Sequence, residues 1–176
     1  MVAQPGPVQT AYIRYMGAAQ PGQPGSAVAK STDTRICETS AGIGFGLAVC
    51  QGNTDRGALL GCPSGRQFIG ITISDPTLPN LSLPGPDEYQ LGDNMAIANL
   101  GDWWVPVGDT PSVEPGIESV YFDATTGILT PTPTSNTVKI EGARWQTSTK
   151  TYIRPTDGVE IAVAMVRLSL IAGNSE

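Results

Sequence analysis

Four carboxylates, Asp87, Glu88, Asp93 and Asp102, are the side chains in this sequence best suited to acid–base chemistry. Two carboxyl groups about 5 to 9.5 Å apart across a cleft would support glycoside hydrolysis. Asp93 and Asp102 each follow a glycine, however, and that pairing is typical of turns. The chain has no histidine, which is the commonest general base and zinc ligand. We therefore expect no catalytic residue and no metal site.

Two glycine-rich stretches superficially resemble loops that bind phosphate or carry a nucleophile. Residues 42–46 read Gly-Ile-Gly-Phe-Gly, but Leu47 follows where the pattern G-x-G-x-x-G needs its third glycine. Residues 61–66 read Gly-Cys-Pro-Ser-Gly-Arg, without the spacing of a nucleophile elbow or the lysine of a phosphate loop. Both stretches are interpreted as backbone turns, and we expect no cofactor.

The three cysteines, Cys37, Cys50 and Cys62, are odd in number and contain no C-x-x-C pair. This spacing supports neither a disulfide framework nor a zinc knuckle. We interpret all three as buried free thiols, because unpaired cysteine behaves as a small apolar residue.

The composition argues against two classes of partner. The formal net charge is −6, and charged residues make up only 15% of 176 residues. A negative protein is repelled by phosphate backbones and by anionic lipid headgroups, so neither nucleic acid nor a membrane surface is expected. No apolar run reaches the ~18 residues of a membrane span, and no signal peptide is recognised. We expect synthesis in a cytosol-like compartment.

The elements that would position any site begin after an extended N-terminal arm, residues 1–34. Four prolines and four glycines in this stretch disfavour a helix or a central strand. Between them lies an apolar cluster, which we expect to dock on another subunit or on the protein's own body rather than remain a loose terminus: Tyr12, Ile13, Tyr15 and Met16.

From residue 35 onward the apolar residues alternate with a period of two, which is typical of strands. Residues 43–49 alternate bulky side chains with glycine or alanine, and the bare face predicts close approach of another backbone. Residues 159–168 are apolar on both faces, which predicts a strand at the centre of a sheet. Further strands are predicted at residues 69–73, 95–99, 103–107 and 120–122, with a turn at 101–102, a long loop at 76–93 and the nearest helix candidate at 87–90. The regular turn spacing predicts an all-β sandwich or barrel.

Trp103 and Trp104 are adjacent, and adjacent strand residues face opposite sides of a sheet. We therefore expect one of the two rings to point outward. An outward tryptophan would serve as a stacking platform for a sugar, as a contact between subunits, or as a residue covered by the loop 76–93.

The order of these segments resembles the structural cement, or capsid decoration, proteins of tailed bacteriophages with HK97-type capsids. Each segment is only a strand and a turn, so the specificity of the resemblance lies in their order. It covers about residues 34–170 and rests on residues 44–49 (GFGLAV), 68–72 (FIGIT), 89–97 (YQLGDNMAI), 101–105 (GDWWV), 120–123 (VYFD) with 126–127 (TG), 140–145 (IEGARW) and 162–170.

The resemblance implies a β-sandwich or jelly-roll-like capsid-binding domain over residues 35–176, preceded by the arm. It implies a virion protein on the outer capsid surface, made in the host cytoplasm, which clamps neighbouring major capsid subunits and associates with itself as a dimer or trimer at symmetry axes. No catalysis is implied. The residues predicted for the interface are Tyr12, Ile13, Tyr15, Met16, Trp103 and Trp104. The alternatives are a carbohydrate-binding module that uses Trp103 or Trp104, and a hydrolase of unrecognised type.

Overall fold

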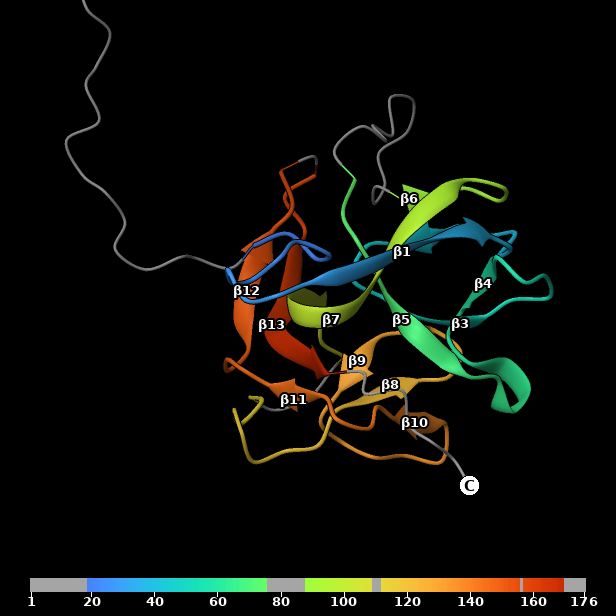
Figure 1. The fold of residues 1–176 in the computed structure, drawn as a ribbon. Coiled ribbons are helices and arrows are strands. Elements are labelled where there is room, and N and C mark those ends of the chain that lie inside the picture. The colour runs from blue at the N-terminus through green and yellow to red at the C-terminus, as the bar shows by residue number, and fades with distance from the viewer. Residues whose placement is uncertain (1–18, 76–87, 109–111, 156, 170–176) are drawn as a thin grey trace, which may run out of the picture.

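The computed structural model describes residues 19–75, 88–108, 112–155 and 157–169, which form an all-β protein with one short 3₁₀ helix at Pro63–Gly65 (Figure 1). The strands in chain order are β1 (Ser31–Cys37), β2 (Ile43–Gly44), β3 (Ala48–Gln51), β4 (Gly57–Leu60), β5 (Phe68–Thr72), β6 (Glu88–Tyr89), β7 (Asn94–Pro106), β8 (Tyr121–Asp123), β9 (Leu129–Thr130), β10 (Thr137–Lys139), β11 (Arg144–Trp145), β12 (Lys150–Ile153) and β13 (Glu160–Ser169).

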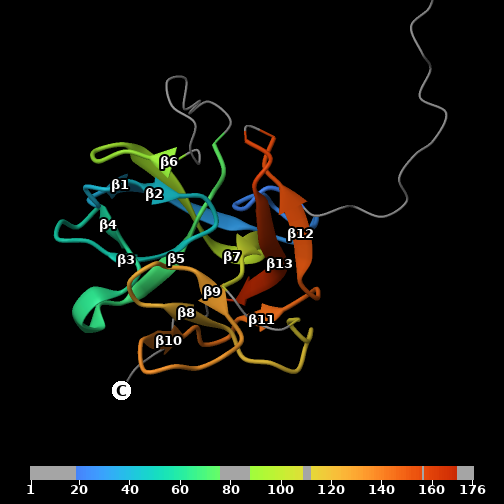
Figure 2. The same cartoon turned by 180° about the vertical axis from the view of Figure 1, so that it is seen from behind.

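Five strands close into a barrel in the order β1-β4-β3-β5-β7, because β1 pairs both with β4, in parallel, and with β7. Beyond β7 the sheet continues through β13 to β11 and β12. A second sheet, β10-β8-β9, lies below the barrel in Figures 1 and 2, and the pair β2–β6 lies at its upper end. The all-β prediction is confirmed, with a closed barrel and additional strands.

Two apolar cores hold these layers together. The barrel core lies inside the barrel, and the intersheet core lies between the outer wall of the barrel, β13 and the second sheet. The barrel core comprises Cys37, Ile43, Phe45, Val49, Ala58, Tyr89, Met95 and Ile97. The intersheet core comprises Ala48, Cys50, Cys62, Ile71, Ala98, Trp103, Val105, Val107, Val113, Val120, Phe122, Leu129, Ile140, Trp145, Ala164, Val166 and Leu168.

Strand β7 belongs to both cores because a bulge changes the direction of its side chains. In its pairing with β1, two neighbouring residues of β1 lie opposite Ala98 and Leu100, so β7 has one extra residue between these two positions. Gly101, which follows, has a φ of +107°. An inserted residue moves every later side chain to the opposite face. Met95 and Ile97 therefore face the barrel core, whereas Trp103 faces the intersheet core.

The structure corrects three predicted elements. The turn expected at residues 101–102 is part of β7, because Gly101 accommodates the bulge without ending the strand. The alternating run 43–49 is divided into β2 and β3 at Gly46, whose φ is +76°. The helix candidate at residues 87–90 contains strand β6.

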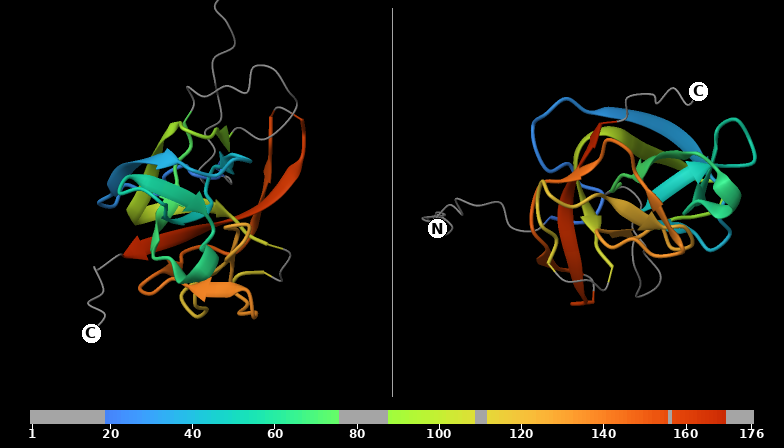
Figure 3. Two further views of the ribbon diagram at one scale, coloured as in Figure 1. Left: turned by 90° about the vertical axis from the view of Figure 1, so that its right-hand side faces the viewer. Right: turned by 90° about the horizontal axis from the view of Figure 1, so that it is seen from below.

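Strands β5 and β13 confirm the two strands predicted most directly by alternation. β13 lies between β7 on one side and β11 and β12 on the other, and it is the long red strand that crosses the molecule in the left view of Figure 3. The expected close backbone approach is confirmed at Gly46, where a Cβ atom would lie 3.0 Å from the Gly22 nitrogen.

Candidate functional site

Both tryptophans predicted for an interface are buried, so the expectation that one ring points outward is wrong. Trp103 is 3% exposed within the intersheet core, and Trp104, on the opposite face of β7, is 1% exposed. Met165 lies directly across the strand pair from Trp104, and Lys150 Nζ sits 5.8 Å from the centroid of its ring. Neither ring offers a face to a sugar or to another subunit.

Beside Trp104, the same face of β7 carries an ion pair in which the carboxylate is buried and the arginine is partly exposed. Asp102 is 2% exposed and accepts hydrogen bonds from Arg167 Nε and Nη2 at 2.6 and 2.8 Å, and from the Ser26 hydroxyl at 2.6 Å. The bonds from Arg167 lower the pKa of the Asp102 carboxyl, against the effect of its burial. Asp102 is therefore a structural anion that fastens residue 26 and β13 to β7.

The remaining carboxylates do not form a catalytic pair. Asp93 Oδ2 accepts the Gln90 N–H at 2.7 Å and Glu88 Oε1 accepts the Gln90 side-chain amide at 3.0 Å, while Asp87 lies outside the described residues. Among the residues that the structure describes, no group of three or more His, Cys, Asp or Glu side chains is arranged to hold a metal ion. In the same residues, no helix has the length and apolar character needed to span a membrane.

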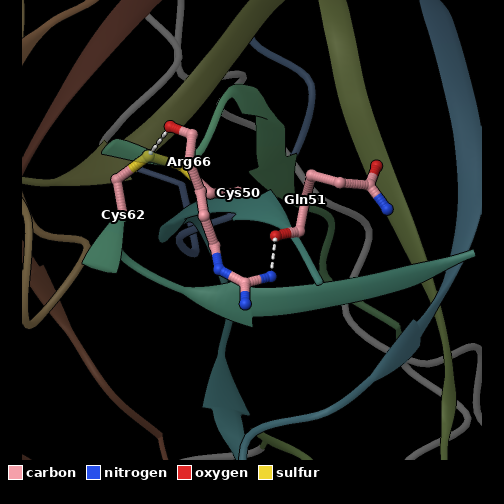
Figure 4. Close-up of a disulfide and its surroundings, with 4 residues drawn as sticks. All are labelled: Cys50, Gln51, Cys62 and Arg66. Carbon is pink, nitrogen blue, oxygen red and sulfur yellow. Dashed lines mark hydrogen bonds between the residues drawn. A yellow bond between two sulfur atoms is a disulfide. The ribbon is translucent and has the colours of Figure 1, made fainter. Parts of the chain in front are cut away.

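The interpretation of all three cysteines as free thiols is wrong for two of them. Cys50 on β3 and Cys62 after β4 form a disulfide, with a Cα–Cα distance of 5.3 Å (Figure 4). Strands β3 and β4 are antiparallel neighbours, which brings together two cysteines that are 12 positions apart in the sequence. Arg66 braces the same turn by donating to the Gln51 carbonyl oxygen at 3.0 Å. Cys37 alone is a buried free thiol, and burial raises its pKa.

The arm residues predicted for the interface, Tyr12, Ile13, Tyr15 and Met16, lie outside the described residues. The chain that follows them runs along β7 and is joined to it by an isolated antiparallel bridge between Pro24 and Trp103. Gly22 N–H donates to Trp104 O at 2.8 Å, Trp104 N–H to Gln23 O at 2.9 Å, and Gly25 N–H to Asp102 O at 2.7 Å. Strand β1 then begins at Ser31, within the range expected for the arm.

An apolar groove of about 480 Å³ opens where this segment enters the described structure. We call it the Phe45 groove, and its walls come from the N-terminal segment, the β2–β3 turn, the β12–β13 hairpin and the ends of β4, β6 and β7. Its main apolar residues are Pro21, Phe45, Leu47, Pro106, Tyr152 and Ile161. Glu88 and Arg154 also line it.

Sequence reasoning missed the Phe45 groove, because its lining residues are distant in the chain. The one available signal was the bare face of residues 42–46, and Gly42 and Gly44 do lie in the wall of the groove.

A second apolar surface is the tip of the β12–β13 hairpin, at one edge of the molecule in Figure 2. Ile153 and Val159 are 58% and 47% exposed there. Arg154 forms an ion pair with Asp157, and Asp157 Oδ1 also accepts the Val159 N–H at 3.1 Å. The bonds from Arg154 lower the pKa of the Asp157 carboxyl. The tip is therefore a shaped turn that presents apolar side chains to solvent.

Comparison with solved structures and with family models relates the chain to phage proteins. A solved chain from the capsid of the Myoviridae phage XM1 has the same fold, with a TM-score of 0.66 and 14% identity over 93% of this chain and 98% of that one. No curated protein matches the sequence. The family model of the structural cement proteins, a family whose description names E217 gp24 and Pam3 gp6, matches residues 8–169. The chain belongs to the structural cement protein family of bacteriophages.

Proposed function

We propose that this protein binds the outer surface of a phage capsid with an HK97-type major capsid protein and clamps neighbouring capsid subunits, without catalysing a reaction. The observation that carries the proposal is the family match over residues 8–169, which includes part of the arm as well as the barrel. A rigid body with an extended arm can contact two subunits at once.

The charge of the protein supports a position outside the shell. A net charge of −6 opposes contact with packaged DNA, whose phosphates attract basic proteins. The low proportion of charged residues also reduces the number of hydrated ions that must be stripped of water when a surface is covered. Synthesis in the host cytoplasm, followed by binding to the assembled shell, fits both properties.

Two surfaces are suited to the contacts. The hairpin tip offers Ile153 and Val159, and the arm offers the apolar residues Tyr12, Ile13, Tyr15 and Met16. The arm would also support association of the protein with itself as a dimer or trimer. Trp103 and Trp104 have no part in these contacts, because both are buried.

Such binding would stabilise the shell by linkage. A protein that binds the assembled lattice and not its dissociated subunits adds free energy to the assembled state at every occupied site. Because many copies bind, a modest stabilising free energy at each site adds up to a large stabilisation of the shell.

Co-sedimentation of the full-length protein with unexpanded and expanded capsid shells tests the proposal. We expect saturable binding to expanded shells at a fixed ratio of copies per capsid subunit, together with a higher shell melting temperature. Absence of binding to both kinds of shell would refute the proposal. The carbohydrate-binding alternative has no support from the described residues, since the rings it needs are buried.

A further inference from the structure

The Phe45 groove exposes apolar surface beside Gln20 and Pro21, near the point where the described part of the arm begins. Leu47, Pro106 and Ile161 are each only partly buried, and Phe45 forms the floor at 7% exposure. A volume of about 480 Å³ is in the range of pockets that hold a ligand the size of a few side chains. Apolar surface of this kind is favourable to cover.

We propose that the Phe45 groove receives the N-terminal arm of a second copy of this chain, with Tyr12, Ile13, Tyr15 and Met16 seated in it. The proposal deepens the self-association part of the proposed function and rests on it.

The composition of the arm matches that of the groove. Residues 1–18 contain one apolar cluster, 12–16, and one charged side chain, Arg14, inside that cluster. Glu88 lines the groove, and so does Arg154, whose charge is already paired with Asp157. An arm seated in the groove would therefore bring Arg14 to a wall where Glu88 offers the complementary charge.

The hydrogen bonds of the next segment argue against an arm that folds back into its own groove. Only residues 17–19 separate Met16 from Gln20, so a returning arm would lie directly beside residues 20–24. Pro21 and Pro24 have no N–H to donate. The N–H groups of Gly22 and Gln23 are already donated to the carbonyl oxygens of Trp104 and Gln20. A returning arm would therefore find only the Gln20 N–H as a donor for a strand ladder along residues 20–24, whereas an arm from a second copy can enter the groove from another direction.

The groove lies on the face of the molecule where the described chain begins, since Gln20 and Pro21 line it. Two copies that meet on this face can each give an arm and receive one, which is the self-complementary arrangement of a two-fold interface. In a trimer the same exchange would run around a ring. In both cases every groove is filled.

Charge reversal in the full-length protein tests the exchange in solution, without shells. We expect R14E and E88R each to weaken self-association by on the order of tenfold, measured by analytical ultracentrifugation, because each places like charges together at every junction. An equimolar mixture of the two variants should associate like the wild type, since both junctions of the mixed pair are then complementary. The double variant R14E/E88R should also associate, which checks that each change is tolerated by the fold. K139E, on β10 of the second sheet, and E141R, just after β10, are the matched controls.

A second variant blocks the groove itself. Gly44 lines the groove, its φ is not in the left-handed region, and a Cβ atom there would make an ordinary 3.5 Å contact with Leu47. We expect G44L to weaken self-association at least tenfold with an unchanged circular dichroism spectrum, and Val138→Phe, which adds bulk on β10, to have no effect.

Three outcomes would overturn the proposal: a wild-type protein that remains monomeric at all concentrations, a mixture of R14E and E88R that is no better associated than either alone, or self-association unaffected by G44L. Recovery in the double variant but not in the mixture would assign the arm to its own groove. Shell binding is measured separately, so saturable binding by a monomeric protein would reject the arm exchange and leave the proposed function standing.

Discussion

The barrel core and the intersheet core differ in size and in how they are enclosed. Among the residues that the structure describes, the barrel core holds eight buried hydrophobic residues, whereas the intersheet core holds seventeen. The larger core thus lies outside the barrel, on the wall formed by Ala48, Ile71 and Ala98. The barrel therefore depends on β13 and the second sheet to cover its wall, and the two cores should unfold as one unit.

The strongest test of this comparison is Trp145→Ala, which removes a side chain that is 1% exposed in the intersheet core. We expect a loss of about 4 kcal/mol in the free energy of unfolding, from lost apolar burial and the cavity left behind. Denaturant unfolding should give coincident transitions by circular dichroism and by fluorescence. Val138→Ala, at a half-exposed position on β10, is the control. Two separate transitions would mean that the cores are independent.

The disulfide joins the two strands β3 and β4 on the side of the barrel wall that faces the intersheet core. Closing a loop of this length should stabilise the fold by about 3 kcal/mol through the restricted unfolded chain. We expect Cys50→Ala/Cys62→Ala to lower the midpoint of denaturation, and a reductant to lower that of the wild type similarly. A reductant should leave the double variant unchanged. An equal response of both proteins would show that the cross-link has no part in the effect.

Acid should act on the Asp102–Arg167 ion pair of β7 before it acts on the two apolar cores. The pKa of Asp102 is lowered mainly by its hydrogen bonds with Arg167, so the stability it contributes is present above the ordinary aspartate pKa of about 4 and is lost as the pH falls through the lowered value. We expect the fall in melting temperature between pH 6 and pH 3 to be smaller in Asp102→Asn than in the wild type. Ser26→Ala, which keeps Arg167, should behave in between. Equal acid responses in all three proteins would contradict this assignment.

The smallest expected effect on stability is at the hairpin tip. Ile153→Ser and Val159→Ser remove exposed apolar groups, so the free energy of unfolding should change by no more than about 0.5 kcal/mol. Under the proposed function both variants should bind expanded shells more weakly. Ile117→Ser, at an 80% exposed position far along the chain, is the matched control. Full shell binding by both tip variants would remove this surface from the proposed contact.

The alternation of apolar residues predicted the positions of β5 and β13, and β13 keeps one register with β7 along its length. In β5 a bulge in the pairing with β3 places Ile69 against the barrel core and Ile71 in the intersheet core, so the alternation did not give the faces of that strand. It failed for β7, where Gly101 and the bulge change the face of the strand without ending it. A glycine followed by an aspartate has the same composition in a turn and in a bulge. Only the pairing of β7 with β1 and β13, which are remote in the sequence, distinguishes the two.

The candidate site could be predicted only in part. The strand rule that adjacent residues face opposite sides correctly placed Trp103 and Trp104 on opposite faces. The burial of Trp104 could not be predicted, because its neighbours Met165 and Lys150 come from strands distant in the sequence. The disulfide between Cys50 and Cys62 was missed for a similar reason, since the antiparallel pairing of β3 and β4 is what brings them together. The contact role of the arm residues remains a prediction.

The attachment of residues 22–25 to β7 has a mechanical consequence. The hydrogen bonds of Gly22 and Gly25 to Trp104 and Asp102 run across the strand direction. A pull on the arm along the strand direction loads these hydrogen bonds in shear, so they share the force and do not break one after another. Beneath them, Arg167 and Ser26 converge on Asp102 and tie the same strand to its neighbours. If the arm bears load between subunits of a pressurised shell, the force would enter the body of the protein at β7, a strand that is bonded to neighbours on both sides.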